Sequence, residues 1–139
     1  MKAQPCVVLI GIALTVVLIL PFSQASQEKA DPGKILGTWK VEVFAGDTTY
    51  SLSLVVSETQ GELAGKISES MGSFSDVAIS DIFYDGEIFR FNFISPTPPD
   101  GLSRTVKAEF KVGLDTMDGV ISVPELDVTT EAKATRESK

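Results

Sequence analysis

The segment Gly37-Thr38-Trp39-Lys40-Val41-Glu42-Val43 decides the fold class of this chain, because its apolar and polar side chains alternate in steps of two. Successive side chains of a β-strand point to opposite faces of the sheet, so the tryptophan and the two valines share one face. The lysine and the glutamate share the other face. The pattern therefore predicts a strand at about 38–45 in a sheet with one apolar and one polar side.

The same alternation continues toward the end of the chain and is interrupted by short turn signals. The strongest of these is Asp85-Gly86 between apolar flanks, a pair typical of two-residue hairpins. A slip in the alternation near Ser80-Asp81 indicates a β-bulge. The segment Ser95–Gly101 holds three prolines and is expected to be the longest loop, since proline has no N–H for a strand ladder. We expect eight strands, at about 38–45, 49–56, 62–68, 74–84, 89 to the proline segment, 104–112, 117–123 and 128–136.

Eight short strands with hairpin connections predict an all-β fold in which neighbours in sequence pair antiparallel. Such a sheet buries its apolar side and removes its edges when it curls into an up-and-down barrel and pairs its first strand with its last. We place this barrel domain at 35–136, followed by a tail at 137–139. The alternative is a two-sheet sandwich, which needs long crossover connections, and the proline segment is the one candidate for such a connection.

A short internal echo relates two of the expected hairpins. Gly61-Glu62-Leu63-Ala64-Gly65-Lys66-Ile67 resembles 115–121, and the match places Gly119 where the first copy has Gly65. A glycine inside a strand is costly unless it permits a sharp bend or the close approach of a large neighbour. The echo predicts two equivalent hairpins, and the alternative is coincidence in a chain with 11 glycines.

The N-terminal segment 1–25 has the pattern of a secretory signal peptide. Lys2 gives a minimal positive start, a long uncharged apolar run follows, and Ser23-Gln24-Ala25 offers small residues at a cleavage site. A polar linker at 26–34 separates this leader from the first strand. The alternative is an uncleaved membrane anchor, for which the apolar run is short. We expect an exported protein, periplasmic or extracellular, that contacts a membrane only through the leader if the leader is kept.

The residue types that are missing exclude several classes of function. There is no histidine, and the one cysteine, Cys6, lies in the leader. After the leader the chain has no disulfide, no thiol nucleophile, no Ser-His-Asp triad and no His/Cys metal site, so we expect a protein that is not an enzyme and uses no metal or cofactor. The net charge of −7 argues against nucleic acid as a partner. Carboxylates cluster around the hairpin signal and are expected to be solvated: Asp81, Asp85 and Glu87.

Gly37-Thr38-Trp39 at the start of the first strand resembles the Gly-x-Trp signature of the lipocalin and wider calycin group. In that group an arginine near the end of the last strand stacks over the tryptophan, and Arg136 stands at the matching place. A guanidinium over an indole gains cation–π energy, roughly 0.5–2 kcal/mol, while it joins the first strand to the last. The resemblance covers 35–136 and is closer to compact bacterial calycin-like domains than to typical lipocalins. It implies transport of a small apolar ligand.

An eight-stranded barrel has room either for its own side chains or for one small ligand. Besides the tryptophan, the expected lining holds five aromatic residues that are our candidate ligand contacts: Tyr50, Phe89, Phe91, Phe93 and Phe110. The tyrosine hydroxyl is expected to serve either a ligand at an open end bounded by the proline segment or a backbone carbonyl. The first functional hypothesis is thus a non-catalytic barrel that binds a small hydrophobic or amphipathic molecule. The second is a filled barrel that serves as a structural or protein-interaction module of the cell envelope.

Overall fold

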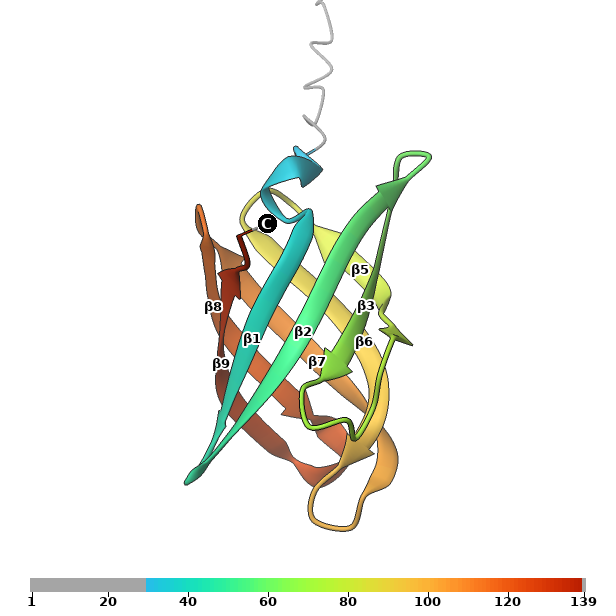
Figure 1. Ribbon diagram of the computed structural model, residues 1–139, viewed down its shortest axis with the longest axis vertical. Helices are drawn as coiled ribbons and strands as arrows, with labels where there is room; N and C mark the ends of the chain where they lie inside the picture. The colour runs from blue at the N-terminus through green and yellow to red at the C-terminus, as the bar shows by residue number, and fades with distance from the viewer. Residues whose placement is uncertain (1–29, 139) are drawn as a thin grey trace, which may run out of the picture.

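The computed structural model describes residues 30–138 as one antiparallel sheet of nine strands that curls into a nearly closed barrel (Figure 1). The strands are β1 (Gly37–Ala45), β2 (Thr48–Thr59), β3 (Glu62–Glu69), β4 (Val77–Ala78), β5 (Ser80–Tyr84), β6 (Ile88–Thr97), β7 (Leu102–Val112), β8 (Thr116–Val123) and β9 (Val128–Arg136). Two short 3-10 helices are η1 (Pro32–Lys34) and η2 (Pro124–Leu126). The expected signal peptide at 1–25 lies outside the described residues. Within 30–138 no helix is both long enough and apolar enough to cross a membrane.

The strands follow one another around the barrel in the order β4-β3-β2-β1-β9-β8-β7-β6-β5. β1 pairs with β2 on one side and with β9 on the other, so the first and last strands of the chain meet as expected. Trp39 lies opposite Arg136 in this ladder. All nine strands belong to a single sheet, which contradicts the sandwich alternative.

The prediction of a single strand at 74–84 is wrong. This stretch forms two strands, β4 and β5, and the barrel therefore has nine strands instead of the expected eight. Its first part, β4, pairs with β3, and its second part, β5, pairs with β6 at the opposite edge of the sheet. The break falls at Ile79, because a segment that passes from one edge to the other must change its pairing partner. Beyond the break the register shifts between Ser80 and Phe83, and Asp81 takes a left-handed conformation with φ 49°. The expected irregularity near Ser80-Asp81 is therefore confirmed as a shift of register, of the kind that a β-bulge produces.

The proline loop is shorter than expected. β6 continues through Pro96 to Thr97 and pairs with β7 over this whole stretch, so only 98–101 form the connection. We expected proline to end the strand, but proline is incompatible only with a strand that has paired neighbours on both sides. β5 pairs with β6 no further along than Asn92, so Pro96 lies where β6 has a partner on one side only. A missing N–H is tolerated at such an edge position.

The inward-facing side chains form one apolar core. Its largest fully buried members are Trp39, Phe89, Phe91, Phe110, Ile35, Leu54, Ile67, Met117 and Val41. On the outer face, four charged residues lie opposite one another across β7, β8, β9 and β1, in the order Lys111, Asp118, Lys133 and Glu42. Opposite charges on neighbouring strands favour this register, and a slip by one residue would also turn the apolar side chains outward.

The internal echo corresponds to two hairpins with the same register. Gly65 pairs with Val56 between β3 and β2, and Gly119 pairs with Phe110 between β8 and β7, so each pair lies 54 residues from its counterpart. A Cβ on Gly119 would collide with the backbone oxygen of Glu109. Glycine is needed there because the two strands approach too closely for any side chain, as the sequence indicated.

Candidate functional site

The four phenylalanines expected to contact a ligand pack against one another in the core. Phe89, Phe91, Phe93 and Phe110 are at most 3% exposed. The ring centroids of Phe89 and Phe91 lie 5.2 Å apart, and those of Phe91 and Phe110 lie 6.3 Å apart. These separations are typical of aromatic rings in contact. Two hollows on the surface of residues 30–138, described below, have none of these four residues in their walls.

Tyr50 does not join this aromatic group. It lies opposite Val43 near the turn between β1 and β2, where it is half-buried and packs against the margin of the core. Among the residues that the structure describes, no ring contact links it to the four phenylalanines. The structure thus brings together four of the five expected ligand contacts and leaves the fifth apart.

The end of the barrel that carries Trp39 is closed by its own side chains. The Trp39 indole N–H donates to the carbonyl of Ile35 at 2.9 Å, and Ile35 is fully buried. The Arg136 guanidinium lies over the indole, 4.3 Å from the ring centroid, and donates to the carbonyls of Lys34 and Leu36. η1, which precedes β1, also lies at this end of the barrel (Figure 1). Trp39 and Arg136 therefore join β1, β9 and the segment that carries η1.

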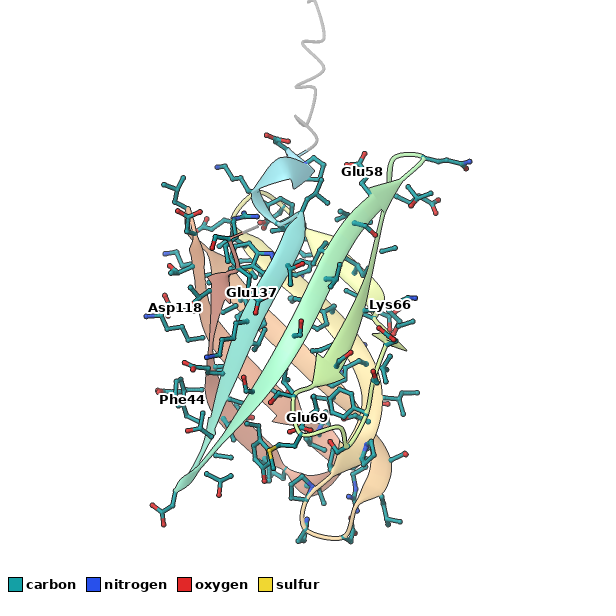
Figure 2. The ribbon with its side chains drawn as sticks, in the orientation of Figure 1. Phe44, Glu58, Lys66, Glu69, Asp118 and Glu137 are labelled. Atoms are coloured by element: carbon teal, nitrogen blue, oxygen red, sulfur yellow. The ribbon has the colours of Figure 1, made fainter. Side chains whose placement is uncertain are left out.

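The opposite end holds inward-facing polar side chains that are paired within the chain. Arg104, whose side chain is 10% exposed, donates to both carboxylate oxygens of Asp100 at 2.7 Å and to the hydroxyl of Thr97 at 2.8 Å. These bonds from the guanidinium hold the pKa of the Asp100 carboxyl well below its usual range. Glu69, at the lower end of β3 in Figure 2, accepts from the backbone N–H and the hydroxyl of Ser73, both at 3.1 Å. Both sets of bonds fix connections between strands, which is a structural role.

The barrel is not closed between β3 and β5, and we call this gap the open seam. The two strands approach each other (Figure 1), but no strand pairing joins them. At the start of the gap, the Ile79 N–H donates to the Gly65 carbonyl at 3.0 Å. The open seam forms a hollow of about 550 Å³ whose wall comprises Gly61, Glu62, Leu63 and the segment 79–84. Sequence reasoning missed it, although the slip near Ser80-Asp81 marked the segment responsible.

The wall of the open seam is acidic and includes an unpaired hydroxyl. Glu62 and Asp81 stand in this wall, and both are exposed. Tyr84 lines the same wall, and its hydroxyl is buried without a hydrogen-bond partner in the described part of the chain. Burial, and then the nearby carboxylates of Asp31 and Asp85, raise the pKa of this hydroxyl. The hydroxyl therefore stays protonated at neutral pH.

Two charged residues beside the open seam are engaged in structural contacts. Asp85 accepts from two backbone N–H groups of its own turn, at 2.7 and 2.8 Å, and these bonds hold the pKa of its carboxyl below the usual value. Arg90 lies 4.4 Å from the centroid of the Phe83 ring and 4.0 Å from a carboxylate oxygen of Glu109. The expectation that the hairpin acids are merely solvated is thus incomplete, because Asp85 holds its turn together.

A second hollow, of about 390 Å³, is lined by Lys40 and the segment 135–138 near the closed end. In the part of the chain that the structure describes, no group of three or more histidine, cysteine, aspartate or glutamate side chains is placed to hold a metal ion. Comparison with known proteins finds no matching family model, no matching curated protein and no matching solved structure.

Proposed function

We propose that this chain is an exported, non-catalytic barrel that serves as a protein-interaction module of the cell envelope, with its interior filled by its own side chains. The observation that carries the proposal is the burial of the four core phenylalanines, which occupy the space that a carrier would keep for its ligand. Export rests on the leader at 1–25. Kinship with the calycin group rests on Gly37-Thr38-Trp39 and on the stacking of Arg136 over the indole.

A carrier of small hydrophobic or amphipathic molecules is the second candidate, and the open seam is the observation that favours it. Its hollow of about 550 Å³ falls within the size range of ligand sites, and its wall includes Leu63 and Ile82. However, ligand pockets usually bury most of the surface of their ligand. The open seam lies on the outside of the barrel between two strand edges, so a small molecule there would keep much of its surface in water. We therefore rank the interaction module first.

Native mass spectrometry of the protein purified from its own source distinguishes the two candidates. Under our proposal the measured mass is that of the bare chain. A small molecule that copurifies in stoichiometric amount would contradict the proposal and support the carrier.

A titration with benzene, followed by NMR, provides a second test with a matched control. Phe91→Ala opens a cavity at the centre of the core and should bind benzene, because apolar cavities of this kind stay dry and accept apolar probes. The substitution should also lower the free energy of unfolding by about 3–5 kcal/mol, and Phe91→Leu is the milder variant if the first one unfolds. The unaltered chain should show no benzene binding in its core. Equal binding by the unaltered chain would contradict a filled interior.

A further inference from the structure

We propose that the open seam binds an extended, basic peptide segment of a partner protein, which adds to the barrel as an extra strand. The inference rests on the proposed interaction function and gives it a site and a partner chemistry. It follows from three features of the open seam: the direction of its backbone groups, its shape and its charge.

Within residues 30–138, Leu63 on one edge of the open seam and Tyr84 on the other present backbone groups that no strand of the barrel pairs. In an antiparallel ladder, the N–H and C=O of successive residues point to alternate sides of the strand. Gly65 gives its carbonyl to Ile79, so Leu63, two residues earlier, directs its N–H and C=O into the same gap. On the other edge the Asp85 N–H donates to β6, so Tyr84, one residue earlier, directs its backbone groups into the gap. Both edges thus offer a donor and an acceptor to an incoming strand.

Unpaired strand edges are the surfaces on which extended peptides dock by strand addition. In this mode, main-chain hydrogen bonds give the affinity and alternate side chains give the specificity. A hollow that is open along its outer side suits a peptide strand, because the outward side chains of that strand remain in solvent. The same openness makes the hollow a poor site for a small molecule.

The charge of the open seam selects a basic partner. Glu62 and Asp81 stand in its wall, two further aspartates lie close enough to Tyr84 to raise the pKa of its hydroxyl, and the wall contains no lysine or arginine. The neighbouring cation Arg90 is already engaged by Phe83 and a glutamate. A second copy of this chain would bring an equally acidic edge, so like charges would oppose self-pairing through the open seam.

The side chains around the open seam define the sequence pattern of the partner. A strand between the two edges points alternate side chains outward and inward. The outward positions lie beside Glu62 and Asp81, which are both exposed, so lysine or arginine fits there. The inward positions lie over Leu63, Ile79 and Ile82, so an apolar side chain fits there. The partner segment therefore alternates basic and apolar residues.

The test uses three labelled hexapeptides and the purified exported protein. The first alternates lysine and valine, the second alternates glutamate and valine, and the third is the lysine peptide with every second amide N-methylated. Fluorescence anisotropy should show that the lysine peptide binds at least about tenfold more tightly than either of the others. The glutamate peptide lacks the matching charge, and the methylated peptide lacks the main-chain donors. NMR should show that the lysine peptide shifts the amide signals of Leu63 and Tyr84.

Two variants with the same change of charge serve as a matched pair. Glu62→Lys reverses a charge in the wall of the open seam and should lower the affinity for the lysine peptide at least about fivefold. Glu131→Lys makes the same change at an exposed position on β9, away from the open seam, and should leave the affinity within about twofold. Both residues are exposed, so neither change should prevent folding.

Three results would each overturn the inference. One is equal affinity for the lysine and glutamate peptides. Another is a set of NMR shifts that avoids Leu63 and Tyr84, and the third is no binding of any peptide at about 1 mM. These results would contradict the peptide site but not the proposed interaction function. A copurifying small molecule would contradict the proposed function, and it would leave the result of the peptide measurements unchanged.

Discussion

The two places where strands from distant parts of the sheet approach each other differ in how they are joined. Where β1 meets β9, a continuous ladder of paired residues runs along both strands, and the stacking of Arg136 over Trp39 completes its end. We call this junction the closed seam. Where β3 approaches β5, pairing stops at the bond between Ile79 and Gly65, and the open seam follows. One barrel thus contains a fully paired junction and an unpaired one.

The difference shows how strand length controls closure. β1 and β9 have nine residues each, and six consecutive residues of one pair with six of the other, from Trp39–Arg136 to Phe44–Glu131. The segment 77–84 has to serve both β3 and β6, and it divides into two residues for the first and five for the second. It is too short to complete both ladders. Unpaired edges invite aggregation, and the exposed carboxylates of Glu62 and Asp81 are of the kind that protects such edges.

Truncation should be far more damaging at the closed seam than at the open seam. Trp39→Ala removes a fully buried ring together with its hydrogen bond and its contact with Arg136, and should lower the free energy of unfolding by about 3–5 kcal/mol. Leu63→Ala removes a half-buried side chain beside the open seam and should lower it by about 1 kcal/mol. Urea denaturation measures both values, and equal losses would show that the two junctions are equally well packed.

The two equivalent glycines should show the same contrast between a complete ladder and the open seam, since Gly119 lies in the ladder between β7 and β8. Gly119→Ala should lower the free energy of unfolding by about 3 kcal/mol, because the new Cβ would collide with the backbone of Glu109 and Phe110 inside a complete ladder. Gly65→Ala should lower it by only about 1–2 kcal/mol. An added Cβ would lie 2.7 Å from the backbone oxygen of Val55 and 2.8 Å from the end of the Ile79 side chain. These overlaps are smaller than the one at Gly119, and one of the two is with a side chain, so we expect the smaller loss. A larger loss at Gly65 would contradict the comparison.

Sequence reasoning predicted the closed seam and missed the open seam for a physical reason. Alternation reports which face of a sheet a side chain takes, so the strand at Trp39 could be recognised. The role of the arginine at the end of the chain was expected from the resemblance of Gly37-Thr38-Trp39 to the Gly-x-Trp signature. Alternation does not report which strand is the partner, so 74–84 was expected to be one strand although it pairs with two. Phenylalanines at every second position also look the same whether they line a cavity or fill it. The outcome depends on the radius of the barrel, which a local pattern does not contain.

The unpaired hydroxyl beside the open seam gives a smaller, pH-dependent effect. Tyr84→Phe removes a buried polar group that has no partner among residues 30–138, and should raise the free energy of unfolding by about 1 kcal/mol at pH 7. Because the pKa of the hydroxyl is raised in the folded state, the unfolded chain ionises first when the pH passes about 10. The unaltered protein should then lose stability faster than the variant. Urea denaturation at pH 7 and pH 10.5 checks this, and parallel losses would argue against burial of the hydroxyl.

Amide hydrogen exchange measured by NMR tests the contrast between the seams most directly. The Glu137 N–H donates to the Thr38 carbonyl, so the backbone groups of Thr38 point toward β9. Backbone groups of every second residue point to the same side of a strand, so the amides of Lys40 and Glu42 also point toward β9. These amides should exchange only through global unfolding, whereas those of Leu63 and Tyr84 should exchange with little protection, because no strand within residues 30–138 covers them. Equal protection at both junctions would mean that the barrel is fully closed, and the binding site proposed for the open seam would be lost with it.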